Sequence, residues 1–180
     1  DVLDAFKRAI PKLENATSEQ IGEYLDSMDT SQQMQGVINS VQGVLGELEA
    51  SEYFESLGYH PILPDSIYNP GYDISLYDDH NNLVDIVQIK TTANPSIVQE
   101  HLEKYPDIPA YVTEDVYAKM DSHPNIHQLP FSSNDIKNNI QDTFSNIDSI
   151  NSPNLDVAVE SGIYSLGIST ALNAFILFNN

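Results

Sequence analysis

Residues 71–92 read GYDISLYDDHNNLVDIVQIKTT, and this stretch decides the fold that the sequence predicts. Two apolar runs, 72–77 and 83–92, flank the polar segment 78–82. Alternation of apolar and polar residues in the second run is typical of a half-buried strand, and a short polar segment between two such runs is typical of a turn. The stretch therefore predicts an antiparallel β-hairpin.

The hairpin carries an acid, an amide and an amine that can meet on one face. Gln88 and Lys90 share a face of the second strand because side chains alternate along a strand. Asp73, near the start of the first strand, can reach that face across the hairpin. A metal-dependent phosphodiesterase needs such groups: a carboxylate, a second oxygen ligand and a cation beside the attacking water. The alternative is a structural ion pair between Asp73 and Lys90, because an inward lysine needs a partner.

The sequence before the hairpin predicts helices. Thr17-Ser18-Glu19-Gln20 is a capping box that opens a helix. Asp29-Thr30 caps a longer helix over residues 31–57, and Gly58 ends that helix as a C′ glycine. A short strand is expected at residues 59–63.

The sequence after the hairpin begins with a helix, with Asn94 as its N-cap and Pro95 at its first position. The remaining predicted elements are a strand over 110–113, a helix over 114–120, an irregular loop over 123–133, a polar helix over 134–150 and a last helix from Ser152. In chain order, the core is helix, three antiparallel strands, helix, strand and helix, which predicts an α/β sandwich.

Composition excludes several kinds of site. The 180 residues contain no cysteine, which excludes disulfides, thiolate zinc sites and cysteine nucleophiles. The first residue is not methionine, which predicts a fragment of a longer protein or a processed product, and with no recognisable signal peptide the expected location is cytoplasmic. His123 and His127 lie four apart in a Pro-flanked loop without a further ligand, so zinc is not expected there. The other histidines are expected at the surface or at an edge, and these are His60, His80 and His101.

A net charge of −20 limits how this chain can bind nucleic acid. A protein that holds duplex DNA by its phosphates brings several lysines and arginines to one face, and this chain has seven in all. Three arrangements reconcile the charge with such a partner: further domains of a longer protein supply the contacts, a protein partner covers the acidic and apolar surface, or the few cations gather at the site. The third arrangement predicts that Lys90, Lys104 and Lys119 lie on one side.

Four segments together carry a family resemblance: Gly46-Glu47-Leu48-Glu49-Ala50, Leu57-Gly58-Tyr59, Pro70-Gly71-Tyr72-Asp73 and Val87-Gln88-Ile89-Lys90-Thr91-Thr92. In order and spacing, over residues 43–115, the chain resembles the PD-(D/E)xK superfamily of restriction-endonuclease-like nucleases, in the QxK variant of its Mrr-like branch. The resemblance implies an αβββαβ core sandwich over residues 34–133. A helical extension at 1–33 would precede this core, and C-terminal helices at 134–180, the last of them apolar, would complete the domain.

The resemblance also implies a role for each site residue. Glu47 would lie on the helix, Asp73 would be the central metal ligand, Gln88 would occupy the variable acid position and Lys90 would orient the attacking water. One Mg²⁺ or Mn²⁺ would be held by Asp73, Gln88 and the carbonyl of Ile89, with Glu47 binding through water or helping a second ion. Glu49 is the alternative to Glu47. A neutral amide at position 88 removes one charge from the site and weakens metal binding unless the glutamate compensates.

The activity implied is metal-dependent endonuclease hydrolysis of nucleic acid, DNA in preference to RNA. Thr91 and Thr92 could donate to the phosphate, and Tyr68 and Tyr72 could stack on a base. The alternative is a nuclease-fold module with a weak or inactive site that serves as a protein-interaction or assembly domain, which the net charge and Gln88 favour. A third interpretation is a toxin-type nuclease at the end of a larger secreted protein, neutralised by a cognate partner.

The stretch from Ser161 to Asn180 contains no charged residue. Small residues recur in it at every fourth position, at Ser161, Ser165 and Ser169. The stretch predicts a buried core helix, with an oligomer interface or a membrane contact as alternatives. Asn173 and several hydroxyl groups make it a poor spanning segment, so no membrane partner is expected.

Overall fold

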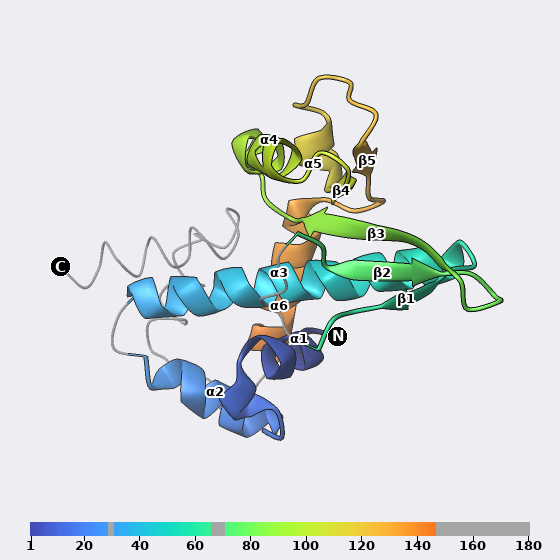
Figure 1. Ribbon diagram of the computed structural model, residues 1–180. Coiled ribbons are helices and arrows are strands. Elements are labelled where there is room, and N and C mark those ends of the chain that lie inside the picture. Colours follow the sequence, from blue (N-terminus) through green and yellow to red (C-terminus); the bar gives the residue numbers. More distant parts are fainter. Residues whose placement is uncertain (29–30, 66–70, 147–180) are drawn as a thin grey trace. The chain divides into compact units, whose positions relative to one another are not determined.

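The computed structural model of the protein describes residues 1–28, 31–65 and 71–146 (Figure 1). These residues form a mixed α/β structure with a five-stranded sheet. The chain divides into two compact units: a helical unit of Asp1–Gln42 with Lys137–Asn180, and a sheet unit of Gly43–Ile136. Several sequence predictions lie outside the described residues: the Asp29-Thr30 cap, the stacking role of Tyr68, the end of the helix over 134–150 and the last helix from Ser152, with its uncharged stretch Ser161–Asn180.

The helical unit contains α1 (Val2–Ala9), the short 3₁₀ helix η1 (Pro11–Leu13), α2 (Ser18–Asp26), the first part of α3 (Ser31–Ser56) and most of α6 (Ser133–Ser145). The predicted capping box is confirmed, because the Gln20 amide donates to Thr17 Oγ1 at 3.3 Å and the Thr17 amide donates to Gln20 Oε1 at 2.9 Å. α1 packs on α6 through the rings of Phe6 and Phe144, whose centroids are 5.3 Å apart. The capping box therefore stabilises the start of α2, and the contact between the two rings holds α1 against α6.

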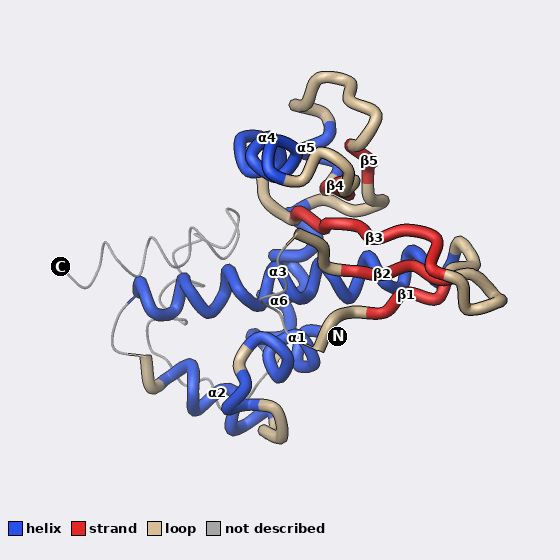
Figure 2. Tube along the Cα trace, viewed as in Figure 1, coloured by secondary structure: helices blue, strands red, loops and turns tan. Residues whose placement is uncertain are grey.

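The sheet runs in the order β1 (His60–Ile62), β2 (Ile74–Tyr77), β3 (Leu83–Lys90), β4 (Ala110–Val112) and β5 (Ile126–Gln128) (Figure 2). β1, β2 and β3 are antiparallel to one another, whereas β3, β4 and β5 are parallel. The predicted hairpin is confirmed: its turn is closed by Asp78, whose Oδ1 accepts from the amides of His80 and Asn82 at 2.9 and 2.8 Å. Asn81 takes the left-handed conformation that such a turn requires, with φ 61°.

The prediction of an irregular loop over residues 123–133 is wrong, because β5 lies within it. This strand has three residues, and only Ile126 is buried while His127 and Gln128 are exposed. A single buried residue produces no periodic pattern, so the strand exists through its parallel pairing with β4 rather than through a local signal.

The end of α3 is fixed by Gly58, as predicted. Its amide donates to the Glu55 carbonyl at 2.9 Å, and the Tyr59 amide donates to the Phe54 carbonyl at 3.1 Å. This pair of bonds is a Schellman motif, which needs the positive φ that Gly58 adopts at 88°. The motif turns the chain from α3 directly into β1.

The two faces of the sheet carry separate apolar clusters. The cluster that joins α3 to the hairpin consists of Ala50, Phe54, Ile74, Leu76, Val87, Ile89 and Leu129. The cluster that joins β4 and β5 to α4 (Pro95–Lys104) and α5 (Glu114–Tyr117) consists of Val98, Ala110, Val112, Val116 and Ile126. Gln88 and Lys90 pair in register with Ala110 and Val112, so both polar side chains face the α4 side of the sheet. α4 begins as predicted, with the Ser96 amide donating to Asn94 Oδ1 at 3.0 Å.

In the described ranges, none of the helices combines the length and the apolar character needed to cross a bilayer.

Candidate active site

Asp73 is held across the hairpin by the strand that follows it in the chain. Its amide donates to the Val87 carbonyl at 2.8 Å, and its carboxylate Oδ2 accepts from the Ile89 amide at 2.8 Å. The same oxygen accepts from the side-chain amide of Gln88. The carboxylate therefore reaches the face that carries Gln88 and Lys90, as the alternation of the hairpin predicted.

Three of the four predicted metal-binding groups converge on one point. The Gln88 side chain is 7 % exposed, and its Nε2 lies between Asp73 Oδ2 and the Ile89 carbonyl oxygen, 3.4 Å from the latter. An amide nitrogen in this position separates two oxygens that would otherwise repel each other. This hydrogen bonding assigns nitrogen to the end of the Gln88 side-chain amide that faces Asp73 and the Ile89 carbonyl, and oxygen to the other end. The site thus brings the Asp73 carboxylate, the Gln88 amide and the Ile89 carbonyl together.

Burial of Asp73 disfavours the ionised form of its carboxyl group. Burial raises the pKa of its carboxyl group above the usual range, while the Ile89 amide, the charge of Lys90 and the Gln88 amide act in the opposite direction. Because burial prevails, the ionised carboxylate is held at a cost that a bound cation would offset. A recessed carboxylate with a raised pKa is more typical of a functional site than of a structural one.

Lys90 acts on Asp73 by its charge and not by a direct salt bridge. The two residues are half-buried on the same side of the sheet, and Lys90 is one of the influences on the Asp73 pKa. No ion pair of 4.0 Å or less joins them in the described structure. The structural alternative, a closed Asp73–Lys90 ion pair, is therefore not what the fold contains.

Gly46, the residue before Glu47, packs against the chain just after β3. A β-carbon built on Gly46 would overlap the methyl group of Thr91, the residue that follows Lys90. α3 therefore approaches the chain most closely one residue before Glu47, which is half-buried, as is Glu49. Burial raises the pKa of Glu49, and the nearby charge of Glu52 raises it further.

The described residues contain no group of three or more histidine, aspartate or glutamate side chains placed to hold a metal. The oxygen donors that the geometry offers are the Asp73 carboxylate and the Ile89 carbonyl, and the Gln88 amide would add a third only with its oxygen turned toward them, because its Nε2 now occupies that position. Oxygen donors of this kind suit Mg²⁺ or Mn²⁺ rather than zinc.

Two residues beside the site that the sequence did not identify, His101 and Tyr105, come from α4 and its C-cap; together they are called the α4 wall. His101 was expected at the surface, but it is 6 % exposed, so that expectation is wrong. Its Nε2 lies 3.0 Å from the Ile108 carbonyl oxygen, and its pKa is lowered by burial, with the Lys90 charge acting in the same direction. Tyr105, one turn further, packs its ring against Gly71, two residues before Asp73. The spacing of Val98, His101 and Tyr105 on one side of the helix is the signal that could have revealed this wall.

The remaining histidines do not form a site among the described residues. His123 Nδ1 accepts from the Asn125 amide at 3.2 Å, whereas the ring of His127 stacks on Tyr111 with centroids 4.8 Å apart. Both contacts lie within the sheet unit and occupy one ring nitrogen of His123 and one ring face of His127.

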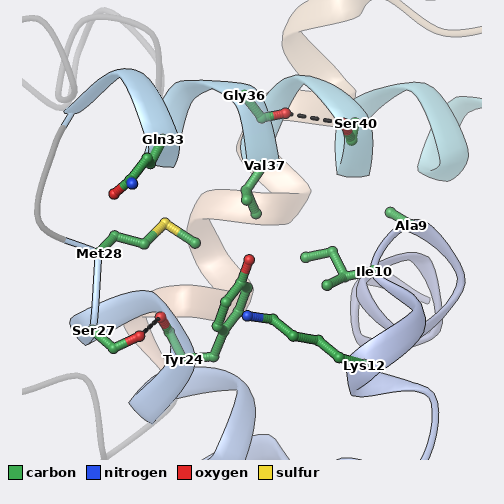
Figure 3. Close-up of a pocket in the computed structure, with 10 residues that line it drawn as sticks. All are labelled: Ala9, Ile10, Lys12, Tyr24, Ser27, Met28, Gln33, Gly36, Val37 and Ser40. Carbon is green, nitrogen blue, oxygen red and sulfur yellow. Dashed lines mark hydrogen bonds between the residues drawn. The ribbon is translucent and has the colours of Figure 1, made fainter.

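A cavity of about 490 Å³ lies in the helical unit (Figure 3). Its only charged lining residue is Lys12, whose Nζ stands over the ring of Tyr24 at 3.9 Å from the centroid. The other lining residues are Ala9, Ile10, Ser27, Met28, Gln33, Gly36, Val37 and Ser40. None of the predicted site residues lines it.

Comparison of the chain with protein-family models, with curated proteins and with solved structures finds no match.

Proposed function

We propose that this protein is a metal-dependent nuclease with a restriction-endonuclease-like core and a PD-(D/E)xK-type site of the QxK variant, acting on DNA in preference to RNA. The observation that carries the proposal is the convergence of the Asp73 carboxylate, the Gln88 amide and the Ile89 carbonyl beside Lys90. The order α3, β1, β2, β3, α4 and β4 is compatible with the αβββαβ core.

In this proposal, each residue has a separate task. Asp73, Gln88 and the Ile89 carbonyl would hold the cation, and Glu47 of α3 would add a further carboxylate. When bound, Mg²⁺ or Mn²⁺ supplies a Lewis acid for the scissile phosphate. As a ligand, the Gln88 side chain would present its amide oxygen, whereas its Nε2 now donates to Asp73. Lys90 orients the attacking water and stabilises the negative charge that develops on it.

One observation favours the second candidate, a nuclease-fold module that binds a protein and does not cleave. Gln88 and Asp73 satisfy each other's hydrogen bonding without a metal, so the fold is complete as it stands. The two candidates differ in metal binding. The nuclease requires a cation at Asp73, and the protein-binding module does not.

The test is cleavage of a labelled plasmid, single-stranded DNA and RNA, each with Mg²⁺, with Mn²⁺ and with a chelator. The variant Lys90→Met keeps the aliphatic stem but removes the charge, and Lys137→Met is the matched control because Lys137 belongs to the helical unit. We expect metal-dependent cleavage in the wild type and the control, reduced at least about a hundredfold in Lys90→Met. Equal cleavage by Lys90→Met would reject the assignment.

Calorimetric titration with Mn²⁺ separates the candidates when no substrate is cleaved. Binding that Asp73→Asn abolishes would support the metal site. A folded wild type that takes up no Mn²⁺ and cleaves none of the three substrates would favour the protein-binding module.

A further inference from the structure

The cations of the sheet unit are few, and a hydrogen bond connects one of them, Lys119, to the chain just after β3. Between Gly43 and Ile136 the only lysines or arginines are Lys90, Lys104 and Lys119. Lys119 Nζ donates to the Ala93 carbonyl at 3.5 Å, and Ala93 lies three residues after Lys90. In a protein with a net charge of −20, Lys90 and Lys119 thus lie close to the end of β3.

Lys104 lies beside the ring of Tyr105, which packs against Gly71. Its Nζ lies 5.2 Å from the centroid of the Tyr105 ring. A β-carbon built on Gly71 would lie 3.1 Å from Tyr105 Cε1, so the ring covers the backbone two residues before Asp73. Gly71 has φ 97°, a backbone conformation that favours glycine. Because glycine has no side chain, the Tyr105 ring can pack directly against this backbone. α4 thereby lies beside the carboxyl-terminal end of β3 (Figure 1).

The groups nearest the Asp73 carboxylate are buried or half-buried, whereas Lys104 and Lys119 are exposed. Gln88 and His101 are buried, while Asp73, Lys90 and Tyr105 are half-buried. A duplex is held by many phosphate contacts on a wide surface, which three lysines cannot provide. A single strand can enter a narrow site, contact a few cations with its phosphates and stack a base on an aromatic ring.

From these contacts we infer that the substrate is a single-stranded nucleic acid, bound along a strip formed by Lys104, Tyr105, Lys90 and Lys119. This inference rests on the proposed nuclease function and names the substrate class of the same site. Lys104 and Lys119 contact phosphates on either side of the scissile bond, Lys90 serves the reaction, and Tyr105 stacks on one base. Two phosphate contacts give a salt dependence of binding with a slope of about −1.4 on a double-logarithmic plot.

The experiment measures binding in a chelator, so that it does not depend on cleavage. The probes are fluorescein-labelled oligo-dT of about twelve nucleotides, oligo-rU of the same length and the dT·dA duplex, followed by anisotropy as salt is raised. We expect each single strand to bind at least about tenfold more tightly than the duplex, and the comparison of dT with rU identifies the preferred sugar.

Variants locate the binding surface. Lys104→Ala and Lys119→Ala should each reduce the salt slope by about 0.7, whereas Lys12→Ala, in the helical unit, should leave it unchanged. Tyr105→Ala should weaken single-strand binding about tenfold, and Tyr105→Phe should retain it, because only the ring is needed for stacking. Thermal unfolding of each variant controls for loss of structure.

Equal affinity for duplex and single strand would overturn the inference, and so would unchanged salt slopes in both lysine variants. Cleavage of duplex DNA that Lys90→Met abolishes, together with no preference for single strands, would reject the single-strand substrate and leave the nuclease function standing. Single-strand binding that requires Lys104 and Lys119, without cleavage in Mg²⁺ or Mn²⁺, would support the strip and reject the nuclease function.

Discussion

Gly46 of α3 and Thr91 at the end of β3 are packed so closely that no side chain fits between them. A β-carbon at position 46 would lie 3.2 Å from Thr91 Cβ and would overlap the Thr91 methyl group. The contact holds α3 at the end of the strand that carries Gln88 and Lys90. It also brings Glu47, the next residue of α3, to that end of the sheet.

Gly46→Ala should therefore destabilise the protein, by about 1–3 kcal/mol in the free energy of unfolding, because the added methyl forces α3 and β3 apart. This loss would occur although alanine has the higher helix propensity. Gly43→Ala is the matched control: it lies in the same helix, and a β-carbon there meets nothing within 4 Å. The control should gain up to about 1 kcal/mol. Urea unfolding measures both values.

The steric overlap with Thr91 in the Gly46→Ala variant can also be relieved by shortening Thr91. Thr91→Ser removes the methyl that the new alanine would strike but keeps the hydroxyl, so Gly46→Ala with Thr91→Ser should recover part of the lost stability. If Gly46→Ala were as stable as Gly43→Ala, the close approach of α3 and Thr91 would be disproved.

Asp73→Asn should separate stability from function. The folded pKa of Asp73 is raised by burial above its unfolded value, so ionisation costs stability, which falls as pH rises through the unfolded pKa and up to the folded pKa. Asparagine keeps an acceptor for the Ile89 amide without the charge. At neutral pH the variant should unfold at the same temperature as the wild type or at a higher one, while Mn²⁺ binding and cleavage are lost. A large drop in thermal stability would instead indicate that the carboxylate is structural.

The hairpin was predictable because its signals are local. The turn around Asp78 and Asn81 follows from short-range hydrogen bonds, and the faces of β3 follow from strand alternation. Gly58 was predictable for the same reason, since a helix end that needs a positive φ selects glycine. From alternation alone, the sequence placed Asp73, Gln88 and Lys90 on one face.

Features that depend on tertiary packing were not predictable. β5 contains one buried residue and forms because β4 offers it an edge. His101 is buried because α4 covers the sheet, and a histidine by itself does not indicate burial; only its spacing from Val98 and Tyr105 does. The choice between Glu47 and Glu49 likewise depends on how α3 meets Thr91, a contact between segments far apart in the sequence.

Asp115 should make stability depend on pH in acid. Burial alone would raise its pKa, but hydrogen bonds from Ser133, through Oγ at 2.6 Å and the amide at 2.9 Å, outweigh burial and lower the pKa. The stabilisation is therefore present above the unfolded pKa, about 3.9, and is lost as pH falls through the lower folded value. The negative charge of Asp115 also lies at the N-terminal end of α6, where it interacts favourably with the helix dipole. Asp115→Asn should therefore lower the free energy of unfolding by about 1 kcal/mol at neutral pH.

Urea unfolding at a series of pH values checks this prediction. The difference between wild type and Asp115→Asn should be constant near neutral pH and should shrink in acid. Asp121→Asn, at an exposed position, is the control and should follow the wild type. A difference that does not change with pH would mean that the charge of Asp115 does not support α6.

Gln88→Glu tests why an amide occupies the variable acid position. In the wild type the Gln88 amide donates to Asp73, so the site is satisfied without a cation. A glutamate would place two carboxylates within hydrogen-bonding distance, and they would repel each other unless a proton or a cation lay between them. In a chelator the variant should therefore unfold at a lower temperature than the wild type, and Mg²⁺ should restore its stability by mass action.

The same substitution should strengthen Mn²⁺ binding about tenfold or more, because a further full charge beside a divalent ion contributes more than about 1.4 kcal/mol. Gln99→Glu adds the same charge at an exposed position of α4 and should change neither property. Calorimetry and thermal unfolding, each with and without metal, give the two readouts. A Gln88→Glu protein as stable as the wild type in chelator, and no better at binding Mn²⁺, would show that position 88 does not face a cation, and the proposed site would fail with it.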